Sequence, residues 1–275
     1  MSAPPLLLVV TPTLGRSVYL DQTMASVAAL HLSVAHVLAT PASQVGRLQG
    51  GYPHALVVPD GGHDAGVYGA LNSGLRQAPP GWEWFTYLND DDVFLDGFSD
   101  VVRLHLARPE PEPVVYGDVA LVDDHGRHLG LTTVERDPRW IPALLQQGIS
   151  PLMQQGMLFR RDWVERLGGF DVRYRLCADL DFWLRAHAAG ASFRYCHQRV
   201  ARFRVHAGQL SGDTALTRRE QADIVGRHYP ARLPAGRRHA AVLRYRLCNL
   251  LRYLGRTRSL GFRTSYQVLH PQSRA

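Results

Sequence analysis

Three consecutive aspartates, Asp90 to Asp92, follow Asn89 directly after the apolar run at residues 84–88. Adjacent carboxylates repel one another, so such a cluster at the end of a buried strand favours a bound divalent cation. Oxygen ligands are those that Mg²⁺ and Mn²⁺ prefer, and such an ion usually also binds a phosphate. A solvated acidic turn or a helix cap needs no ion, so the triplet alone leaves both alternatives open.

Aliphatic runs in the first hundred positions predict the elements that hold this turn in place. Each run is short and ends in polar residues, as buried parallel strands do. The expected strands are residues 6–10, 35–39, 55–58 and 84–88, with helices at residues 19–30 and 67–77 between them. Strand and helix therefore alternate as a parallel α/β sheet requires.

Polar residues follow three of these expected strands. Thr11, Pro12 and Thr13 come after the first, Asp60 after the third, and the aspartate triplet after the fourth. Ligands of parallel sheets bind beyond the carboxyl ends of the strands, so these residues should meet at one edge. An Asp-Gly turn needs no ligand to explain it, which leaves the role of Asp60 open.

Beyond about residue 110 the pattern no longer alternates simply. Strands are expected at residues 114–117, 120–122 and 157–160, and helices at residues 161–167 and 180–189. The fold class is therefore predicted as α/β, with a Rossmann-like, mainly parallel sheet flanked by helices and a mixed second half. We expect one domain over residues 1–214, followed by a helical extension over residues 215–275.

Positive charge is concentrated in this extension. All 31 basic residues of the chain are arginine, and residues 215–275 carry 13 of them with only 2 acidic residues. Two helices are expected from residue 216, separated near Pro230 and Pro234. In the second helix, five leucines share one face between arginines. They are Leu243, Leu247, Leu250, Leu251 and Leu254.

Three alternatives stay open for this leucine face: packing on the domain, binding an anionic membrane surface, and binding a partner protein. No aromatic platform or reading motif predicts nucleic-acid binding. No stretch approaches the roughly 20 apolar residues of a membrane span, and the three widely spaced cysteines favour a reducing compartment. We expect a cytoplasmic protein, either soluble or peripheral at the inner face of the membrane.

Six motifs, in order, carry a resemblance to a known family. They read VVTPT from Val9, GVYGALNSG from Gly66, YLNDDD from Tyr87, LGGFD from Leu167, ADLDFWLR from Ala178 and FRVH from Phe203. Over about residues 6–212 the chain resembles a family 2 glycosyltransferase of the GT-A fold. The resemblance implies inverting transfer of a sugar from a nucleoside-diphosphate sugar to a hydroxyl, with a nucleotide-binding half at about 1–110 and an acceptor half at 111–214.

In this family an Asp-x-Asp motif after the fourth strand binds the ribose of the donor and the metal at its diphosphate. By position, the resemblance implies that Asp91 and Asp92 bind Mn²⁺ or Mg²⁺, with His206 as a third ligand. The alternative for His206 is an ordinary surface residue. Asn89 stands where relatives carry the first Asp. Its amide can bond a ribose hydroxyl but brings no charge to a metal, so Asp90 is expected to contribute.

The same resemblance implies that Asp179 is the general base that deprotonates the acceptor. Ala178 replaces the family's usual Glu, which removes a companion carboxylate. Asp181, on the following helix, is expected to support the acceptor site. The alternative for Asp179 is a helix cap for residues 180–189.

Other positions match donor or acceptor contacts. Arg204 is expected to clamp a phosphate through its guanidinium, with a solvated strand-edge charge as the alternative. The remaining implied nucleotide or donor contacts are Thr11, Pro12, Thr13, Arg16, Asp60, Asn72, Asn89, Asp90 and Asp118. Gln154 and Gln155 are assigned to the acceptor side. A UDP-sugar is the favoured donor, and the acceptor is a carbohydrate, a lipid-linked glycan or a small molecule.

Two other functions stay open. One is a catalytically degenerate domain that binds a nucleotide or a partner, because Asn89, Ala178 and Thr40 depart from the family pattern. The other is a sugar nucleotidyltransferase. That enzyme should carry a glycine-rich phosphate loop after the first strand, where only Gly15-Arg16 follows.

Overall fold

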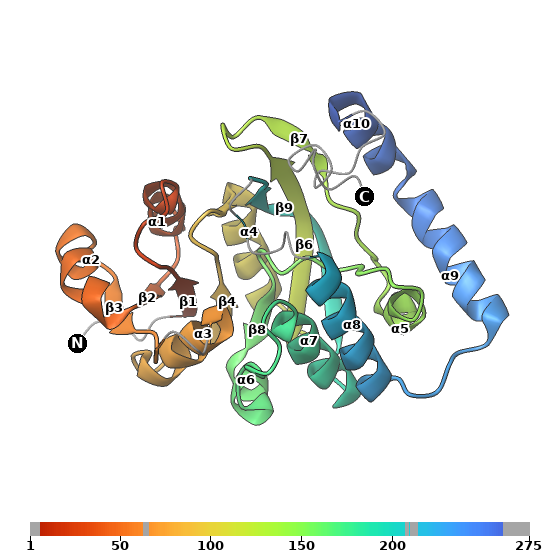
Figure 1. Ribbon diagram of the computed structural model, residues 1–275, viewed down its shortest axis with the longest axis horizontal. Coiled ribbons are helices and arrows are strands. Elements are labelled where there is room, and N and C mark those ends of the chain that lie inside the picture. Colours follow the sequence, from red (N-terminus) through yellow and green to blue (C-terminus); the bar gives the residue numbers. More distant parts are fainter. Residues whose placement is uncertain (1–5, 63–65, 207–208, 210–213, 261–275) are drawn as a thin grey trace.

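The computed structural model describes residues 6–62, 66–206, 209 and 214–260. Its centre is one sheet in the order β3-β2-β1-β4-β8-β6-β9-β5, with β7 paired to β6 (Figure 1). The strands are β1 (Leu7–Pro12), β2 (Val34–Thr40), β3 (Leu56–Pro59), β4 (Trp84–Tyr87), β5 (Val93–Phe94), β6 (Val114–Val122), β7 (His128–Leu131), β8 (Leu158–Arg160) and β9 (Phe193–Arg204). β1 to β4 run parallel, whereas β8 pairs antiparallel with both β4 and β6. The predicted α/β class, with a parallel first half and a mixed second half, is confirmed.

Helices cover both faces of this sheet. They are α1 (Leu20–Ala28), α2 (Val45–Gly51), α3 (Gly66–Gln77), α4 (Asp96–Leu106), α5 (Ile141–Leu145), α6 (Arg161–Leu167), α7 (Ala178–Ala188), α8 (Thr214–His228), α9 (Ala235–Cys248) and α10 (Leu250–Leu260). Short 3-10 turns occupy Ala42–Gln44 and Pro138–Trp140.

Alternate residues of β1 enter two separate cores, because successive side chains of a strand point to opposite faces. Leu8 and Val10 pack in the core formed with α3, α6 and α7. Leu7 and Val9 pack in the core formed with α1 and α4. Since each face is covered, the strand reads as an uninterrupted apolar run, which is why the sequence located it within two residues.

The carboxyl ends of β1 and β4 lie side by side. Val10 and Tyr87 are partners in the parallel register, and the Leu88 amide donates to the Val10 carbonyl at 3.1 Å. The loop after β1 and the turn at residues 89–92 therefore leave the sheet at the same edge. This is the edge at which ligands of parallel sheets bind.

The second half differs from the expected elements in several places. The strands expected at 114–117 and 120–122 form one buried strand, β6. α2, α4, β7 and the full length of β9 were not expected from the pattern. In β9 the half-buried Cys196 is followed by three consecutive exposed residues, which interrupt the buried positions. Neither a continuous apolar run nor a regular alternation therefore marks the strand in the sequence.

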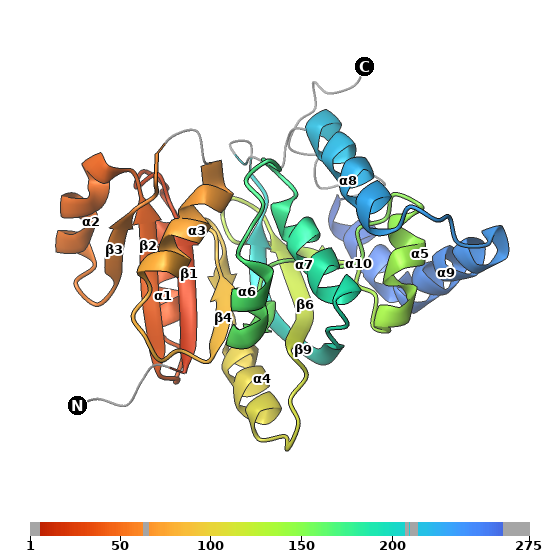
Figure 2. The same ribbon diagram turned by 90° about the horizontal axis from the view of Figure 1, so that it is seen from below.

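The C-terminal helices pack on the domain, and their arrangement corrects the predicted one. Up to residue 260, where the described part of the chain ends, three helices lie from Thr214 onward in place of two, because the expected second helix breaks at Asn249. Ile224 of α8 belongs to the main core, and α9 packs on α5 through Ala241 and Tyr245. α9 and α10 lie at the end of the molecule opposite α2 (Figures 1 and 2).

The face of α9 and α10 that meets the domain is not the leucine face. Buried side chains on these helices are Ala241, Tyr245, Asn249 and Arg252. The five leucines of the predicted stripe are instead 51% to 83% exposed. Within the described residues, no helix is both long and apolar enough to span a membrane.

Candidate active site

The turn after β4 is held by the loop after β1. Thr13 Oγ1 donates to Asp90 Oδ2 at 2.5 Å, and Ser17 Oγ donates to the Asp90 carbonyl at 3.0 Å. Burial raises the pKa of Asp90 to about 6, and the hydrogen bond from Thr13 opposes this shift. Asp90 therefore joins the two loops that leave the shared edge of the sheet.

Asp91 meets His206, which lies just after β9. Asp91 Oδ2 and His206 Nε2 are 3.0 Å apart, and both side chains are partly exposed to solvent. The His206 ring lies 5.4 Å from the ring of Tyr19, measured between centroids. The structure thus brings together two residues that the sequence assigned to one metal site from opposite ends of the domain.

Asp92, the other predicted metal ligand, points into the protein. Its side chain is buried, and both carboxylate oxygens have protein partners: the Arg204 amide at 2.9 Å and Gln155 Nε2 at 2.9 Å. Burial and the neighbouring charge of Asp91 raise its pKa well above the usual range. Asp92 therefore anchors the turn to β9 through both carboxylate oxygens, and its role as a metal ligand stays a prediction.

The remaining pair fits a hard divalent cation that also binds a phosphate ligand. Within the described residues no group of three or more His, Cys, Asp or Glu side chains converges on a metal-sized space. Mg²⁺ and Mn²⁺ sites in phosphate-binding proteins often use only one or two side chains, with phosphate and water oxygens completing the shell. Asp91 and His206 supply one oxygen and one nitrogen donor for that arrangement.

Asp179 lies in the first turn of α7, with a tyrosine of α3 against it. Asp179 Oδ1 accepts hydrogen bonds from Tyr68 Oη at 3.1 Å and from the Leu180 amide at 2.8 Å. Burial raises the pKa of this carboxyl to about 6, and the two hydrogen bonds oppose the shift. Helix α7 begins at Ala178, and its N-cap residue is Cys177, so Asp179 does not occupy the cap position.

Tyr87, the last residue of β4, connects this carboxyl to the acidic turn. Burial, and then the charges of Asp179 and Asp92, raise the pKa of Tyr87 well above its usual range. Gln154 Nε2 donates to the Tyr87 carbonyl at 2.6 Å, and its neighbour Gln155 holds Asp92. Asp179 and the turn at residues 89–92 therefore flank the same strand end.

Comparison with known proteins identifies relatives by sequence and by fold. No protein-family model matches the chain. A PGL/p-HBAD biosynthesis glycosyltransferase of Mycobacterium bovis is 30% identical over 146 residues, which are 53% of this chain and 53% of that protein. A Mycobacterium tuberculosis protein of the same name gives the same values. The chain spans about half the length of the curated relatives it matches.

Solved glycosyltransferases share the fold over most of the chain. S. aureus TarS in complex with UDP-GlcNAc superposes with a TM-score of 0.59 at 15% identity, covering 93% of this chain and 74% of that one. The mannosyltransferase PcManGT of Pyrobaculum calidifontis, in complex with GDP-Man and Mn²⁺, gives 0.51 at 18% identity, covering 94% and 75%. Glucosyl-3-phosphoglycerate synthase of Mycobacterium tuberculosis, with Mn²⁺, UDP and glucosyl-3-phosphoglycerate, gives 0.53 at 13%, covering 83% and 81%.

The chain has the GT-A glycosyltransferase fold. Its sequence is related to that of glycosyltransferases over about half its length. The resemblance to family 2 enzymes, first drawn from six motifs, is confirmed by these relatives.

Arg204 has a different environment from the phosphate clamp expected in such a fold. Its side chain is buried and lies 4.3 Å from the centroid of the Tyr19 ring. Its guanidinium donates to the carbonyls of Asp91, Asp123 and Asp124 and to Gln22 Oε1. The side chain is turned to the protein interior because these four oxygens accept its hydrogen bonds there. It thereby supports the turn at residues 89–92 from the protein side.

Asn72 and Asp118 also form hydrogen bonds with other protein atoms. The Asn72 amide forms two 2.8 Å hydrogen bonds with the backbone of Phe170, so it clamps the Gly-Gly-Phe-Asp loop. Asp118 Oδ1 accepts from Arg252 of α10 at 2.7 Å and from Tyr195 Oη at 2.6 Å. Both side chains thus have protein partners, and their contacts to the nucleotide and the donor sugar stay predictions.

The side chains assigned to the acceptor side fall into two groups. Asp181 is buried and pairs with Arg185 at 2.7 Å and His228 at 3.0 Å, away from Asp179. Gln154 and Gln155 lie under the acidic turn, and each buried Oε1 has no hydrogen-bond partner among the described residues. Of these three side chains, the two glutamines therefore keep a buried polar atom without a described partner.

The other predicted donor contacts lie on the loops around the site. Thr11 is buried and its Oγ1 is 3.0 Å from His36 Nε2, Pro12 ends β1, and Arg16 is exposed. Asp60 forms a turn in which its Oδ1 accepts from the Gly62 amide at 3.0 Å. Asn89, partly exposed, begins the acidic turn, and its carbonyl accepts from the Asp92 amide at 3.2 Å.

Sequence reasoning missed Tyr68 and Tyr19, the aromatic residues that contact the predicted base and metal ligand. Tyr68 precedes Asn72 by four residues, so both share the face of α3 that meets the acceptor half. That spacing was visible in the sequence. Tyr19 had no comparable signal, because its neighbours His206 and Arg204 are distant in the chain.

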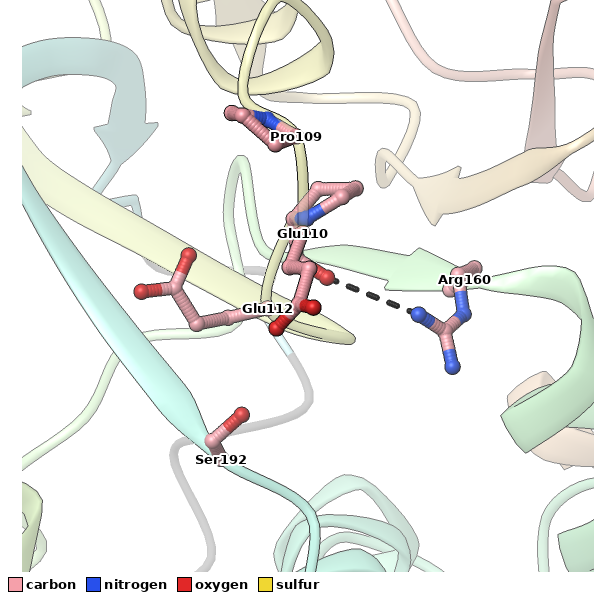
Figure 3. Close-up of a pocket in the computed structure, with 6 residues that line it drawn as sticks. Pro109, Glu110, Glu112, Arg160 and Ser192 are labelled. Atoms are coloured by element: carbon pink, nitrogen blue, oxygen red, sulfur yellow. Dashed lines mark hydrogen bonds between the residues drawn. The ribbon is translucent and has the colours of Figure 1, made fainter.

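A separate hollow of about 620 Å³ lies away from this edge (Figure 3). Pro109, Glu110, Pro111, Glu112, Arg160 and Ser192 line it. Arg160 pairs with Trp84 at the start of β4, whereas the acidic turn follows the end of that strand. The hollow therefore lies at the other end of β4 from the acidic turn and is not part of the candidate site.

Proposed function

We propose that this chain is a metal-dependent, inverting glycosyltransferase that moves a sugar from a nucleoside-diphosphate sugar to an acceptor hydroxyl. The observation that carries the proposal is the environment of the Asp179 carboxyl. Its carboxyl has a pKa of about 6, is oriented by Tyr68 through one oxygen, and flanks the same strand end as Asp91 and His206. A general base works best when its pKa lies near the working pH.

In the proposed reaction Asp179 removes the proton of the acceptor hydroxyl. The hydroxyl oxygen forms a new bond to the anomeric carbon, and the bond from that carbon to the diphosphate oxygen breaks. The proton ends on the Asp179 carboxylate, and the diphosphate departs with the bonding electrons. Attack from the side opposite the leaving group inverts the configuration at the anomeric carbon.

The donor diphosphate is proposed to lie at the acidic turn. A divalent cation held by Asp91 and His206 would neutralise the charge of the departing diphosphate. Asp90, Thr13 and Ser17 fix the turn that presents Asp91. Asp92 and Arg204 hold the same turn from the protein side, which reduces the motion that would otherwise misplace the ligand.

A UDP-sugar is the donor we propose first. Two of the similar structures are complexes with UDP-GlcNAc or UDP, and a third is a complex with GDP-Man and Mn²⁺. The acceptor class stays as broad as the sequence left it: a carbohydrate, a lipid-linked glycan or a small molecule with a hydroxyl.

A thermal-shift panel tests the proposal. Wild-type protein is heated with UDP-, GDP-, CDP- and dTDP-sugars, with and without Mn²⁺, and then Asp91→Ala and the exposed α4 control Asp100→Asn are compared. A ligand that binds only the folded state raises the melting temperature by mass action. We expect an Mn²⁺-dependent shift with one nucleotide, kept in the control and lost in Asp91→Ala.

Two other results would point elsewhere. A shift without hydrolysis or transfer of any donor would favour the catalytically degenerate domain, and synthesis of a sugar nucleotide from a sugar phosphate and a nucleoside triphosphate would favour the nucleotidyltransferase. The absence of any shift under every condition would remove the proposed donor site.

We also propose that α9 and α10 place the enzyme on an anionic membrane surface. Their five leucines face solvent while the helices dock through other residues. Arg246 and Arg258 are exposed beside them, and the extension from residue 215 onward is strongly positive. Apolar area plus arginines suits the boundary between acyl chains and anionic headgroups, where charge attracts and leucine inserts.

Sedimentation with vesicles of phosphatidylglycerol or phosphatidylcholine tests this surface. We expect binding to phosphatidylglycerol only, weakened by salt and by the double change Leu247→Gln and Leu251→Gln. The matched control is Leu104→Gln, an equally exposed leucine on α4. Equal binding of all variants, or self-association relieved by the leucine changes, would contradict a membrane role.

A further inference from the structure

Glu220 of α8 is a buried carboxylate with an unusual set of partners. Only 7% of the residue is exposed. Glu220 Oε1 accepts from the Arg175 amide at 2.7 Å, and Oε2 accepts from the amides of Leu176 and Cys177, each at 2.9 Å. One side chain thus satisfies three successive backbone donors that lie more than 40 residues earlier in the chain.

The segment that Glu220 holds leads directly into Asp179. Cys177 is the N-cap of α7, and Asp179 stands in the first helical turn. From the opposite side, Tyr68 Oη lies 3.0 Å from the Leu176 carbonyl oxygen and 3.1 Å from Asp179 Oδ1, and its one hydroxyl proton is shared between these two acceptors. The backbone before the carboxyl is therefore fixed through its N–H groups by α8 and through a carbonyl by α3.

α8 is itself fastened to α7 at a second point. His228, at the end of α8, lies 3.0 Å from Asp181, one residue position on α7 beyond Leu180. Ile224, between Glu220 and His228, is fully buried in the main core. Glu220 consequently sits on a helix that cannot shift without disturbing its neighbours, which is the condition for holding another group in place.

The charge of Glu220 also acts on Asp179. Burial is the main reason for the raised pKa of Asp179, and the negative charge of Glu220 raises it further, while the Tyr68 and Leu180 hydrogen bonds oppose the rise. The titratable groups around Asp179 are Tyr68 on α3, Tyr87 at the end of β4, Cys177 before α7 and Glu220 on α8. The tyrosine and cysteine pKa values lie well above that of Asp179, so these groups stay neutral as it titrates.

We propose that Glu220 is a positioning residue for the general base: it sets the backbone that presents Asp179 and supplies a fixed negative charge beside it. This inference rests on the proposed role of Asp179. Helix α8 then belongs to the catalytic architecture, although Glu220 itself does not touch the reacting atoms.

The first experiment measures the titration of Asp179 itself and needs no substrate. Protein labelled with ¹³C at the aspartate carboxyl is titrated by NMR, and the Asp179 signal is assigned by its loss in Asp179→Asn. We expect a midpoint near pH 6 in wild type. In Glu220→Gln the midpoint falls, because a negative neighbour has been removed. In Glu220→Asp, which keeps the charge, it stays closer to the wild-type value.

The second experiment measures donor turnover by the same variants. Positioning losses near a reacting group can reach roughly 100-fold, so we expect Glu220→Gln to lower kcat by about 10-fold or more while KM for the donor changes little. The control is Asp223→Asn, which removes the same charge one turn later on α8, where Asp223 bonds Tyr174 and Arg227. In Asp223→Asn, the titration midpoint of Asp179 and kcat should both match wild type.

The outcomes separate the two proposals. An unchanged Asp179 midpoint in folded Glu220→Gln, or an equal fall in Asp223→Asn, would overturn the role of Glu220 whatever reaction the protein catalyses. If Glu220→Gln does not fold, Glu220→Asp decides: a wild-type kcat despite the shorter side chain would exclude positioning. If the Asp179 midpoint falls in Glu220→Gln as expected but no sugar is transferred, the proposed function is overturned. The effect of Glu220 on Asp179 would still hold.

Discussion

Apolar sequence patterns have opposite outcomes in the first hundred residues and in the C-terminal helices. In β1 every residue of the apolar run is buried, as the pattern predicts. In α9 and α10 the leucine stripe faces solvent, and the buried positions include Asn249 and Arg252. An apolar pattern therefore located the core in one region and the exposed surface in the other.

The difference follows from how each region is held. A parallel strand covered on both faces has no exposed side, so any apolar run of that kind must be internal. The junction of α9 and α10 instead docks through specific polar contacts. The Asn249 side chain pairs with both backbone groups of Val134, and Arg252 donates to Asp118 and to the Thr132 carbonyl. Polar docking of this kind leaves no hydrophobic periodicity in the sequence.

The largest effect is expected at the proposed base on α7, which packs against α3 from the first hundred residues. Asp179→Asn removes the proposed base and should lower kcat by roughly 10²–10⁴-fold. The fold should survive, because the amide keeps an oxygen for the Tyr68 and Leu180 hydrogen bonds. Steady-state turnover and a thermal melt check both statements, and near-normal turnover would remove Asp179 from the mechanism.

The polar docking of α10 provides the next test. Arg252→Met should destabilise the protein by about 3–5 kcal/mol, because the buried carboxylate of Asp118 loses its charge partner. The double change Arg252→Met and Asp118→Leu should recover much of this loss. Urea unfolding measures both variants. A change below 1 kcal/mol for Arg252→Met would mean that the leucine stripe, or another contact, holds the helix.

Asn249→Ala removes the amide that pairs with Val134 and leaves two buried backbone groups without that partner. The expected destabilisation is about 1–3 kcal/mol. Asn249→Asp is an informative companion, since it keeps the acceptor for the Val134 amide but loses the donor to the Val134 carbonyl. Urea unfolding should rank wild type above both variants.

The pH dependence of turnover sharpens the role assigned to Asp179. The base acts only when deprotonated, so its raised pKa makes the rate rise with pH up to about 6 and then level off. Below that value kcat should fall about tenfold per pH unit, as for a single essential carboxylate. A flat profile between pH 5 and pH 7 would contradict this assignment.

The smallest effect is expected for an exposed leucine. Leu251→Ala should change the free energy of unfolding by less than about 0.5 kcal/mol, because the side chain is mostly in solvent. Leu71→Ala, in the buried face of α3, should cost about 2–5 kcal/mol by leaving a cavity. Similar costs for both leucines would show that the stripe is covered in solution.

Much of the fold was predictable from local pattern. The parallel strands and α1 and α3 lie within about two residues of their expected limits, and the motif order identified the GT-A fold. The same reasoning selected Asp179, whose role stays a prediction, and it assigned to one site Asp91 and His206, which the structure places 3.0 Å apart. It also placed Asp92, Arg204, Asn72 and Asp118 in contact with ligand, whereas the structure gives them protein partners.

The sequence by itself determined the alternation of strand and helix, the edge at which the site lies, and the residue types that gather there. These depend on periodicity and on neighbours in the chain. Only the tertiary structure decided which face of α9 and α10 is buried, which aspartate of the triplet lies beside His206, and that Glu220 reaches the backbone before Asp179. Each of those outcomes depends on one hydrogen-bonding group meeting another from a distant segment, and the residue types alone do not specify that pairing.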